Sequence, residues 1–145
     1  MSSRLTALAA YGAVANAETN PLQQIIMLYD GAIKFLRLAA DDIKAGDLVA
    51  KAEHSNRALD IVSYLQSILD FENGGGVAAT LDIFYITLSV QILNASAQLD
   101  GRKMKQAAES MLPVREAWVS QFSAARTAYA TTEQRSFTGG QQLMA

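Results

Sequence analysis

His54 is the only histidine in the chain and the side chain best suited to chemistry. A histidine on an exposed helix face could accept a phosphoryl group, and Arg57, three residues later, could steady the phosphate. However, Ala58 stands where phosphotransfer domains usually have a glycine, and Glu53 adds negative charge nearby. A structural role for His54 is therefore favoured, and phosphotransfer is kept as the alternative.

Other reactive constellations are missing from the sequence. There is no cysteine, which excludes a thiol nucleophile, a disulfide framework and thiolate zinc sites. One histidine cannot supply the two Glu-x-x-His motifs of a di-iron bundle. The run Gly74-Gly75-Gly76 lacks the lysine of a phosphate-binding loop and is interpreted as a turn. We therefore expect no catalytic residue, no metal, no cofactor and no enzymatic activity.

The composition narrows the class of protein. The chain has 145 residues, enough for one domain, and half of them are hydrophobic, which excludes wholesale disorder. Twelve basic and fourteen acidic residues give a net charge of −2, so no strong positive field favours nucleic acid. Residues 1–20 lack the apolar core of a secretory signal, and the uncharged stretch 83–99 is interrupted by polar residues. We expect a cytoplasmic protein without stable membrane insertion.

Apolar residues recur at helical spacing along most of the chain, so helices are the elements that must position the residues considered above. Asn20-Pro21 is a helix start, Gly46 suits a helix end, and Asp47 suits the cap of the next helix. The predicted helices run over residues 21 to about 45, 47 to about 70, about 77–97, and 101 to about 129, with a break at 71–76. Short connections make sequential helices antiparallel. The predicted fold is an all-α, antiparallel up-and-down four-helix bundle with a short N-terminal helical segment packed on it.

Three regions are expected along the chain. Residues 1–19 form an alanine-rich, weakly amphipathic segment that could cover a binding groove as a lid. Residues 20–130 form the bundle, and residues 131–145 form a polar, mobile tail. Within the last helix, Pro113 should remove one hydrogen bond and bend the axis. In the first helix, Asp30 and Lys34 stand four residues apart and are predicted to pair.

Two predicted helices carry more apolar surface than one bundle face requires. The helix over 21–45 has one apolar seam through Ile26, Ile33 and Leu36, and a second beside it through Ile25, Leu28, Ala32 and Phe35. The helix over 77–97 likewise has a face through Leu81, Phe84 and Leu88 and another through Ile83, Ile86, Val90 and Leu93. Either both helices are internal, or one seam awaits a partner's helix.

A resemblance to a known family rests on several motifs. The segment Met27–Leu36, with the sequence MLYDGAIKFL, resembles the signature of the FliS family. Asn20-Pro21-Leu22 precedes it at the family's spacing, and Arg115-Glu116-Ala117-Trp118 is similar to the family's closing motif. Together with Leu69-Asp70 and later matches, the resemblance covers roughly residues 20–120.

The resemblance implies an antiparallel helical bundle that binds the disordered C-terminal segment of flagellin. Such a chaperone prevents premature polymerisation and brings flagellin to the flagellar type III export gate, which gives two expected partners. In the family the N-terminal segment can cover part of the site, and Tyr11 matches the tyrosine usually found there. The expected partner-binding residues are Tyr11, Ile25, Leu28, Tyr29, Ala32, Phe35, Ile83, Ile86, Val90 and Leu93. The alternatives are a phosphotransfer bundle using His54 or a generic helical interaction module.

Overall fold

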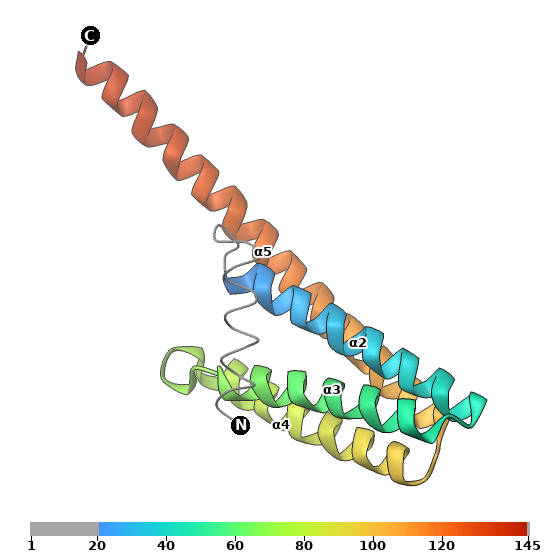
Figure 1. The fold of residues 1–145 in the computed structure, drawn as a ribbon. Coiled ribbons are helices and arrows are strands. Elements are labelled where there is room, and N and C mark those ends of the chain that lie inside the picture. Colours follow the sequence, from blue (N-terminus) through green and yellow to red (C-terminus); the bar gives the residue numbers. More distant parts are fainter. Residues whose placement is uncertain (1–20, 145) are drawn as a thin grey trace.

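A computed structural model describes the backbone of residues 21–144 and the side chains of residues 21–128 and 131. Within this part of the chain every regular element is a helix (Figure 1). The helices are α2 (Pro21–Ala45), α3 (Leu48–Ser67), α4 (Phe71–Ala97) and α5 (Gly101–Met144). The segment 1–19, expected to form a lid, lies outside the described residues, as does Tyr11.

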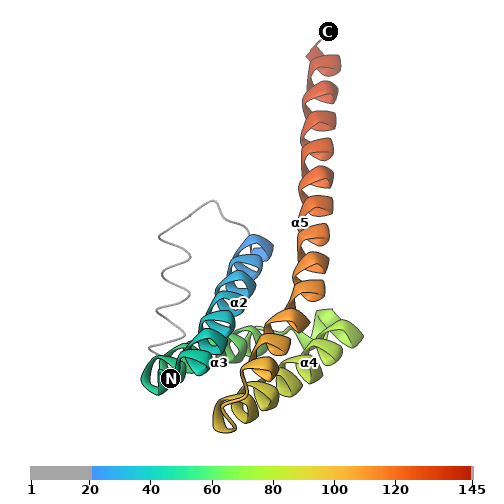
Figure 2. The same ribbon diagram turned by 90° about the vertical axis from the view of Figure 1, so that its right-hand side faces the viewer.

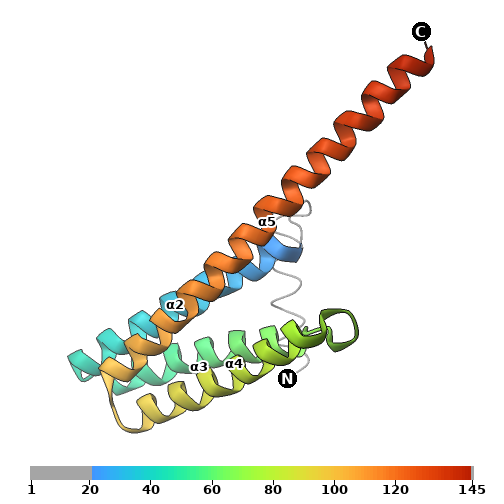
Figure 3. The ribbon, with the colours of Figure 1, turned by 180° about the vertical axis from the view of Figure 1, so that it is seen from behind.

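The four helices form one antiparallel bundle. They are joined by residues 46–47, 68–70 and 98–100, and such short connections turn each helix back along its predecessor. α2 packs against α3 and α5, and α4 packs against the same two helices, so the four close around one core (Figure 1, Figure 3). The predicted all-α bundle is confirmed.

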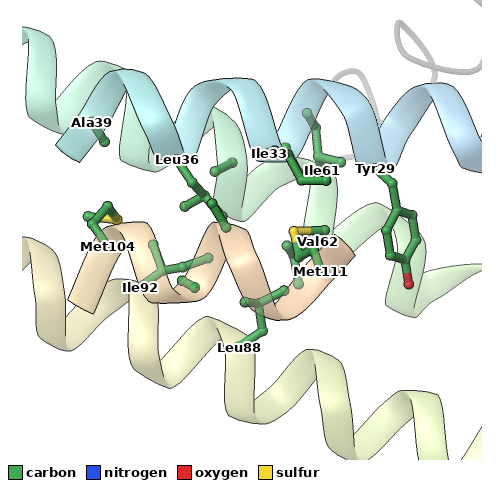
Figure 4. Packing of buried hydrophobic residues seen from close by; sticks show 14 of the residues in the cluster. Tyr29, Ile33, Leu36, Ala39, Ile61, Val62, Leu88, Ile92, Met104 and Met111 are labelled. Atoms are coloured by element: carbon green, nitrogen blue, oxygen red, sulfur yellow. The ribbon is translucent and has the colours of Figure 1, made fainter. Parts of the chain in front are cut away.

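The core takes one apolar face from each helix (Figure 4). Leu36 of α2, Val62 of α3, Ile92 of α4 and Met111 of α5 are all completely buried members of this core. Burying a side chain of this size stabilises the fold by about 1.5–3 kcal/mol. The core is therefore the main source of stability and fixes the orientation of each helix.

The boundary between α2 and α3 follows from local chemistry. Gly46 adopts a positive φ of 75°, which an L side chain tolerates poorly, and it ends α2. Asp47 then caps α3, since its side-chain oxygen accepts a hydrogen bond from the Ala50 amide at 3.1 Å. The predicted cap is confirmed. α3 ends at Ser67, earlier than expected, because Asp70 instead begins the next helix.

The predicted break at 71–76 is smaller than expected. Asp70 caps α4 by accepting from the Asn73 amide at 3.1 Å, and the helix begins at Phe71. The interruption is confined to Gly75, whose φ of 51° and ψ of −124° kink the helix. One permissive residue is enough to redirect the backbone, so the long part of α4 begins just after Gly75, close to the predicted start at about residue 77.

α5 is much longer than predicted. Its 44 residues run to Met144 and extend well beyond the bundle (Figure 1), so the expected end near residue 129 is wrong. No glycine or proline lies between Pro113 and Gly139 to terminate the helix. The axis changes direction part-way along (Figure 2), as expected for the internal Pro113.

An ion pair ties α2 to α5. The guanidinium of Arg115 holds both carboxylate oxygens of Asp30, with Nη2 and Oδ2 3.4 Å apart, and this contact raises the pKa of Arg115. Arg115 also donates to Glu116 at 2.9 Å. Asp30 thus pairs across the helix interface rather than with Lys34, and the prediction of an intrahelical pair is wrong.

Candidate functional site

An apolar strip on α4 faces away from the bundle. Its members are Ile83, Ile86, Val90 and Leu93, which we call the outer strip. Their exposed fractions are 65%, 49%, 51% and 54%, although each is a large hydrophobic residue. The structure therefore leaves on the surface all four residues predicted from this helix.

The position of the outer strip follows from helical geometry. Tyr85, Leu88, Ile92 and Ala95 are buried and fix the inner face of α4. At about 100° per residue, the outer strip lies on nearly the opposite side of the helix. No charged residue occurs from Ile83 to Ala97, so this surface offers apolar contact without a fixed charge.

The partner-binding residues predicted from α2 lie in a different environment. Tyr29 and Ala32 have no exposed surface, so they are core residues and cannot contact a partner in this structure. Ile25, Leu28 and Phe35 are half-buried and pack against the core. α2 packs against both α3 and α5, and these neighbours cover most of its apolar surface. The prediction that Tyr29 and Ala32 line a partner surface is therefore corrected.

His54 is held by its surroundings. Its Nδ1 lies 2.6 Å from Oδ2 of Asp42, and its ring stacks on Phe35 with the centroids 6.0 Å apart. Arg57, which was considered as a phosphate partner, donates to Glu53 at 3.1 Å and lies over the Phe35 ring. These contacts support a structural role for His54.

A second apolar surface, which the sequence analysis did not identify, lies at the end of the bundle where α5 leaves it. Two adjoining hollows there, with volumes of about 260 and 480 Å³, share Leu22, Val77, Leu81 and Trp118. We call them together the mouth cleft. Its lining comes from all four helices, and the only charged member is Asp70. No single helix pattern could reveal such a site, because each helix contributes only a few residues.

A polar group lies among the apolar residues of the mouth cleft. The hydroxyls of Tyr29 and Tyr85 are 2.7 Å apart, and both rings are almost completely buried. Burial raises the pKa of both phenols, so both stay protonated and neutral. The enclosed indole Nε1 of Trp118 lies close enough to lower the pKa of Tyr29 but does not reach good hydrogen-bond geometry.

The described residues contain no group of three or more potential metal-ligating side chains. Among them α4 alone is long and apolar enough to cross a membrane. Its inner face, however, lies in the core against α3 and α5. The outer strip and the mouth cleft are therefore apolar surfaces, and Asp70 is the one charged residue that lines the cleft.

Comparisons with known proteins agree with this geometry. The family described as "Flagellar protein FliS" matches residues 4–125. This chain belongs to the FliS family. It is 33% identical over 100 residues to the flagellar secretion chaperone FliS of Salmonella typhimurium, covering 68% of this chain and 74% of that protein. It is 31% identical over 99 residues to the FliS of Vibrio cholerae, covering 68% and 73%.

A third relative is the flagellar secretion chaperone FliSB of Pseudomonas aeruginosa. It is 24% identical over 102 residues, which cover 70% of this chain and 81% of that protein. The FliS match ends at residue 125, whereas α5 continues to Met144. The match thus covers the residues of the bundle, the outer strip and the mouth cleft, and the last part of α5 lies beyond it.

Proposed function

We propose that this chain is a cytosolic, non-enzymatic chaperone that binds the disordered C-terminal segment of flagellin. In this role it prevents premature polymerisation and delivers flagellin to the flagellar type III export gate. Membership of the FliS family supports this function, and the relatives are named flagellar secretion chaperones. The observation that carries the binding step is the uncharged outer strip of α4.

The outer strip has the spacing that an incoming helix requires. Its residues follow steps of three, four and three along α4, spanning about 15 Å at 1.5 Å per residue. A partner helix with apolar residues at similar steps can lie along such a strip. A segment that is disordered before binding loses conformational entropy on ordering, and burial of the strip offsets this cost.

The mouth cleft supplies a second surface for the same client. Half-buried Ile25 lines it, which gives that residue a place in the proposed site. Residues 1–19, with Tyr11, are proposed to cover part of the site until the client arrives. Amide exchange of residues 3–15, measured with and without client, should show loss of protection on binding, and unchanged protection would count against the lid.

Calorimetry with a peptide of the flagellin C-terminal segment tests the function directly. We expect micromolar or tighter binding with a large negative heat-capacity change, since apolar surface is buried. Val90→Asp places a charge in the outer strip and should weaken binding at least about tenfold. Ile86→Asp should act in the same direction.

Val49→Asp is the matched control. Val49 is 81% exposed and lies on α3, outside both proposed surfaces. Valine and aspartate have similar helix propensities, so both valine variants should keep the wild-type unfolding free energy within about 0.5 kcal/mol. Equal loss of binding in the two variants, or unfolding caused by Val90→Asp, would show that the outer strip is not the binding surface.

A further inference from the structure

The polar group in the mouth cleft has more hydrogen-bond donors than acceptors. Tyr29 and Tyr85 each carry one O–H, and Trp118 adds one N–H. One phenol can donate to the other across the 2.7 Å separation. The second phenol hydrogen then has no acceptor among the described residues, since neither tyrosine makes a further hydrogen bond.

The two tyrosines are not equivalent in position. Tyr85 lines the mouth cleft, whereas Tyr29 is completely buried and is absent from its lining. If Tyr29 donates to Tyr85, the remaining hydrogen belongs to the residue that lines the cleft. If Tyr85 instead donated to Tyr29, the free hydrogen would belong to the enclosed Tyr29 hydroxyl and would be an unsatisfied buried donor. Any occupant of the cleft must therefore offer an acceptor to Tyr85.

We propose that Tyr85 is the hydrogen-bond donor for a main-chain carbonyl of the secreted partner, inserted into the mouth cleft. This assignment rests on the proposed function for the identity of that partner. The carbonyl must be one that the partner's own secondary structure leaves free, in an extended stretch or at a helix end. The apolar side chains on either side of it then pack against Leu22, Leu81 and Trp118.

The surrounding charge favours a neutral carbonyl over a carboxylate. The lining contains no lysine or arginine, and its one charged residue is Asp70. Hydrogen bonds from Asn73 lower the pKa of Asp70, so it stays negative and repels an anion. A purely apolar ligand would leave the Tyr85 donor unpaired, and sites of this kind discriminate strongly against such ligands.

A small probe tests the site without depending on flagellin. N-acetyl-leucine-N-methylamide combines an apolar side chain with neutral carbonyls. Trp118 is the only tryptophan, so its indole N–H gives a single resonance at the cleft in the full-length, ¹⁵N-labelled protein. We expect a saturable shift of this resonance with the diamide, and much weaker binding of N-acetyl-leucine, which carries a carboxylate.

Two conservative variants separate the donor from a merely structural pair. Tyr85→Phe and Tyr29→Phe each remove one hydroxyl from the same buried pair and should lower thermal stability by similar amounts. Tyr85→Phe should weaken diamide binding roughly 3- to 10-fold, the effect of one net hydrogen bond. Tyr29→Phe should bind like the wild type, because Tyr85 keeps its hydrogen. Equal binding by both variants, equal loss in both, or no saturable shift overturns the proposal.

The flagellin C-terminal peptide provides the second arm. If it binds the wild type and Tyr29→Phe equally and Tyr85→Phe more weakly, the partner's carbonyl is assigned to Tyr85. If it binds all three proteins equally, the proposed function stands and this inference is overturned. If the diamide gives the expected order but the peptide does not bind, the carbonyl site stands and the proposed function fails.

Discussion

α2 and α4 share the same sequence feature but lie in different structural environments. Each helix carries two apolar seams, and the sequence pattern does not distinguish one helix from the other. In the bundle, Ala32 of the second seam of α2 is buried and Ile25, Leu28 and Phe35 are half-buried and packed on the core, whereas the outer strip of α4 is about half exposed. A surplus of apolar residues therefore identifies a helix that needs more contact, but its neighbours decide whether the chain itself provides it.

The difference has a structural origin in what lies beside each helix. Phe35 on α2 is covered by His54 and Arg57 from α3, and Asp30 is held by Arg115 from α5. α4 contacts the same two neighbours only through its inner face, so no described residue covers the outer strip. The second seam of α2 contributes to stability, and that of α4 is proposed to contribute to binding.

The largest effect should come from comparing two leucines on α4 itself. Leu88 is 1% exposed and lies in the core, whereas Leu93 is 54% exposed on the outer strip. Leu88→Ala should lower the unfolding free energy by about 2–5 kcal/mol, because it leaves a cavity among packed neighbours. Leu93→Ala should change it by less than about 0.5 kcal/mol. Urea denaturation followed by circular dichroism measures both values.

Binding of the flagellin peptide should show the reverse order. Leu93→Ala should weaken it, whereas Leu88→Ala should not do so at temperatures where that variant remains folded. A stability loss above about 2 kcal/mol in Leu93→Ala would mean that the outer strip is covered and belongs to the core.

The sequence predicted the bundle well because helix caps and seams are local features. Asp47 lies next to the backbone amides it satisfies, and the outer strip follows from spacing within α4. Asp30 shows the limit of local reasoning. Lys34 is its nearest cation along the helix, but Arg115, 85 residues away, is the one that packs beside it. Pairing across an interface depends on which helices become neighbours.

The candidate site was predictable in part for the same reason. The outer strip lies within one helix, whereas the mouth cleft brings together Leu22, Leu65, Val77 and Trp118 from four helices. Tyr29 was predicted as a contact residue, but its hydroxyl meets Tyr85 across the core. Only the assembled bundle shows that Tyr85, one member of this pair, lines a cleft.

The Tyr29–Tyr85 pair joins the two contrasted helices and should make the fold sensitive to alkali. Burial raises the pKa of both phenols, whereas the unfolded chain keeps values near 10.0. The contribution of the pair to stability is full below pH 10 and is lost progressively as the pH rises toward the folded pKa. Between the two values, each phenol lowers the unfolding free energy by up to about 1.4 kcal/mol per pH unit.

Chemical denaturation between pH 8 and about 11 checks this expectation. Tyr29→Phe and Tyr85→Phe should each be less stable than the wild type near neutral pH and should lose stability less steeply above pH 10. Parallel curves for the wild type and both variants would mean that the phenols ionise as readily in the folded bundle as in the unfolded chain.

The smallest effect is expected at the Asp30–Arg115 pair, which helps to fix α2 beside α5. The Asp30 side chain is 51% exposed and that of Arg115 is 28% exposed, so water and salt screen their attraction. A double-mutant cycle of Asp30→Asn and Arg115→Gln should give a coupling energy of about 0.2–1 kcal/mol, decreasing as salt is added. Asp30→Asn should leave flagellin-peptide affinity unchanged, because neither Asp30 nor Arg115 belongs to the outer strip or lines the mouth cleft. A salt-independent coupling above that range would show that the pair is buried from solvent, and that α2 is fixed by charge as well as by its apolar seams.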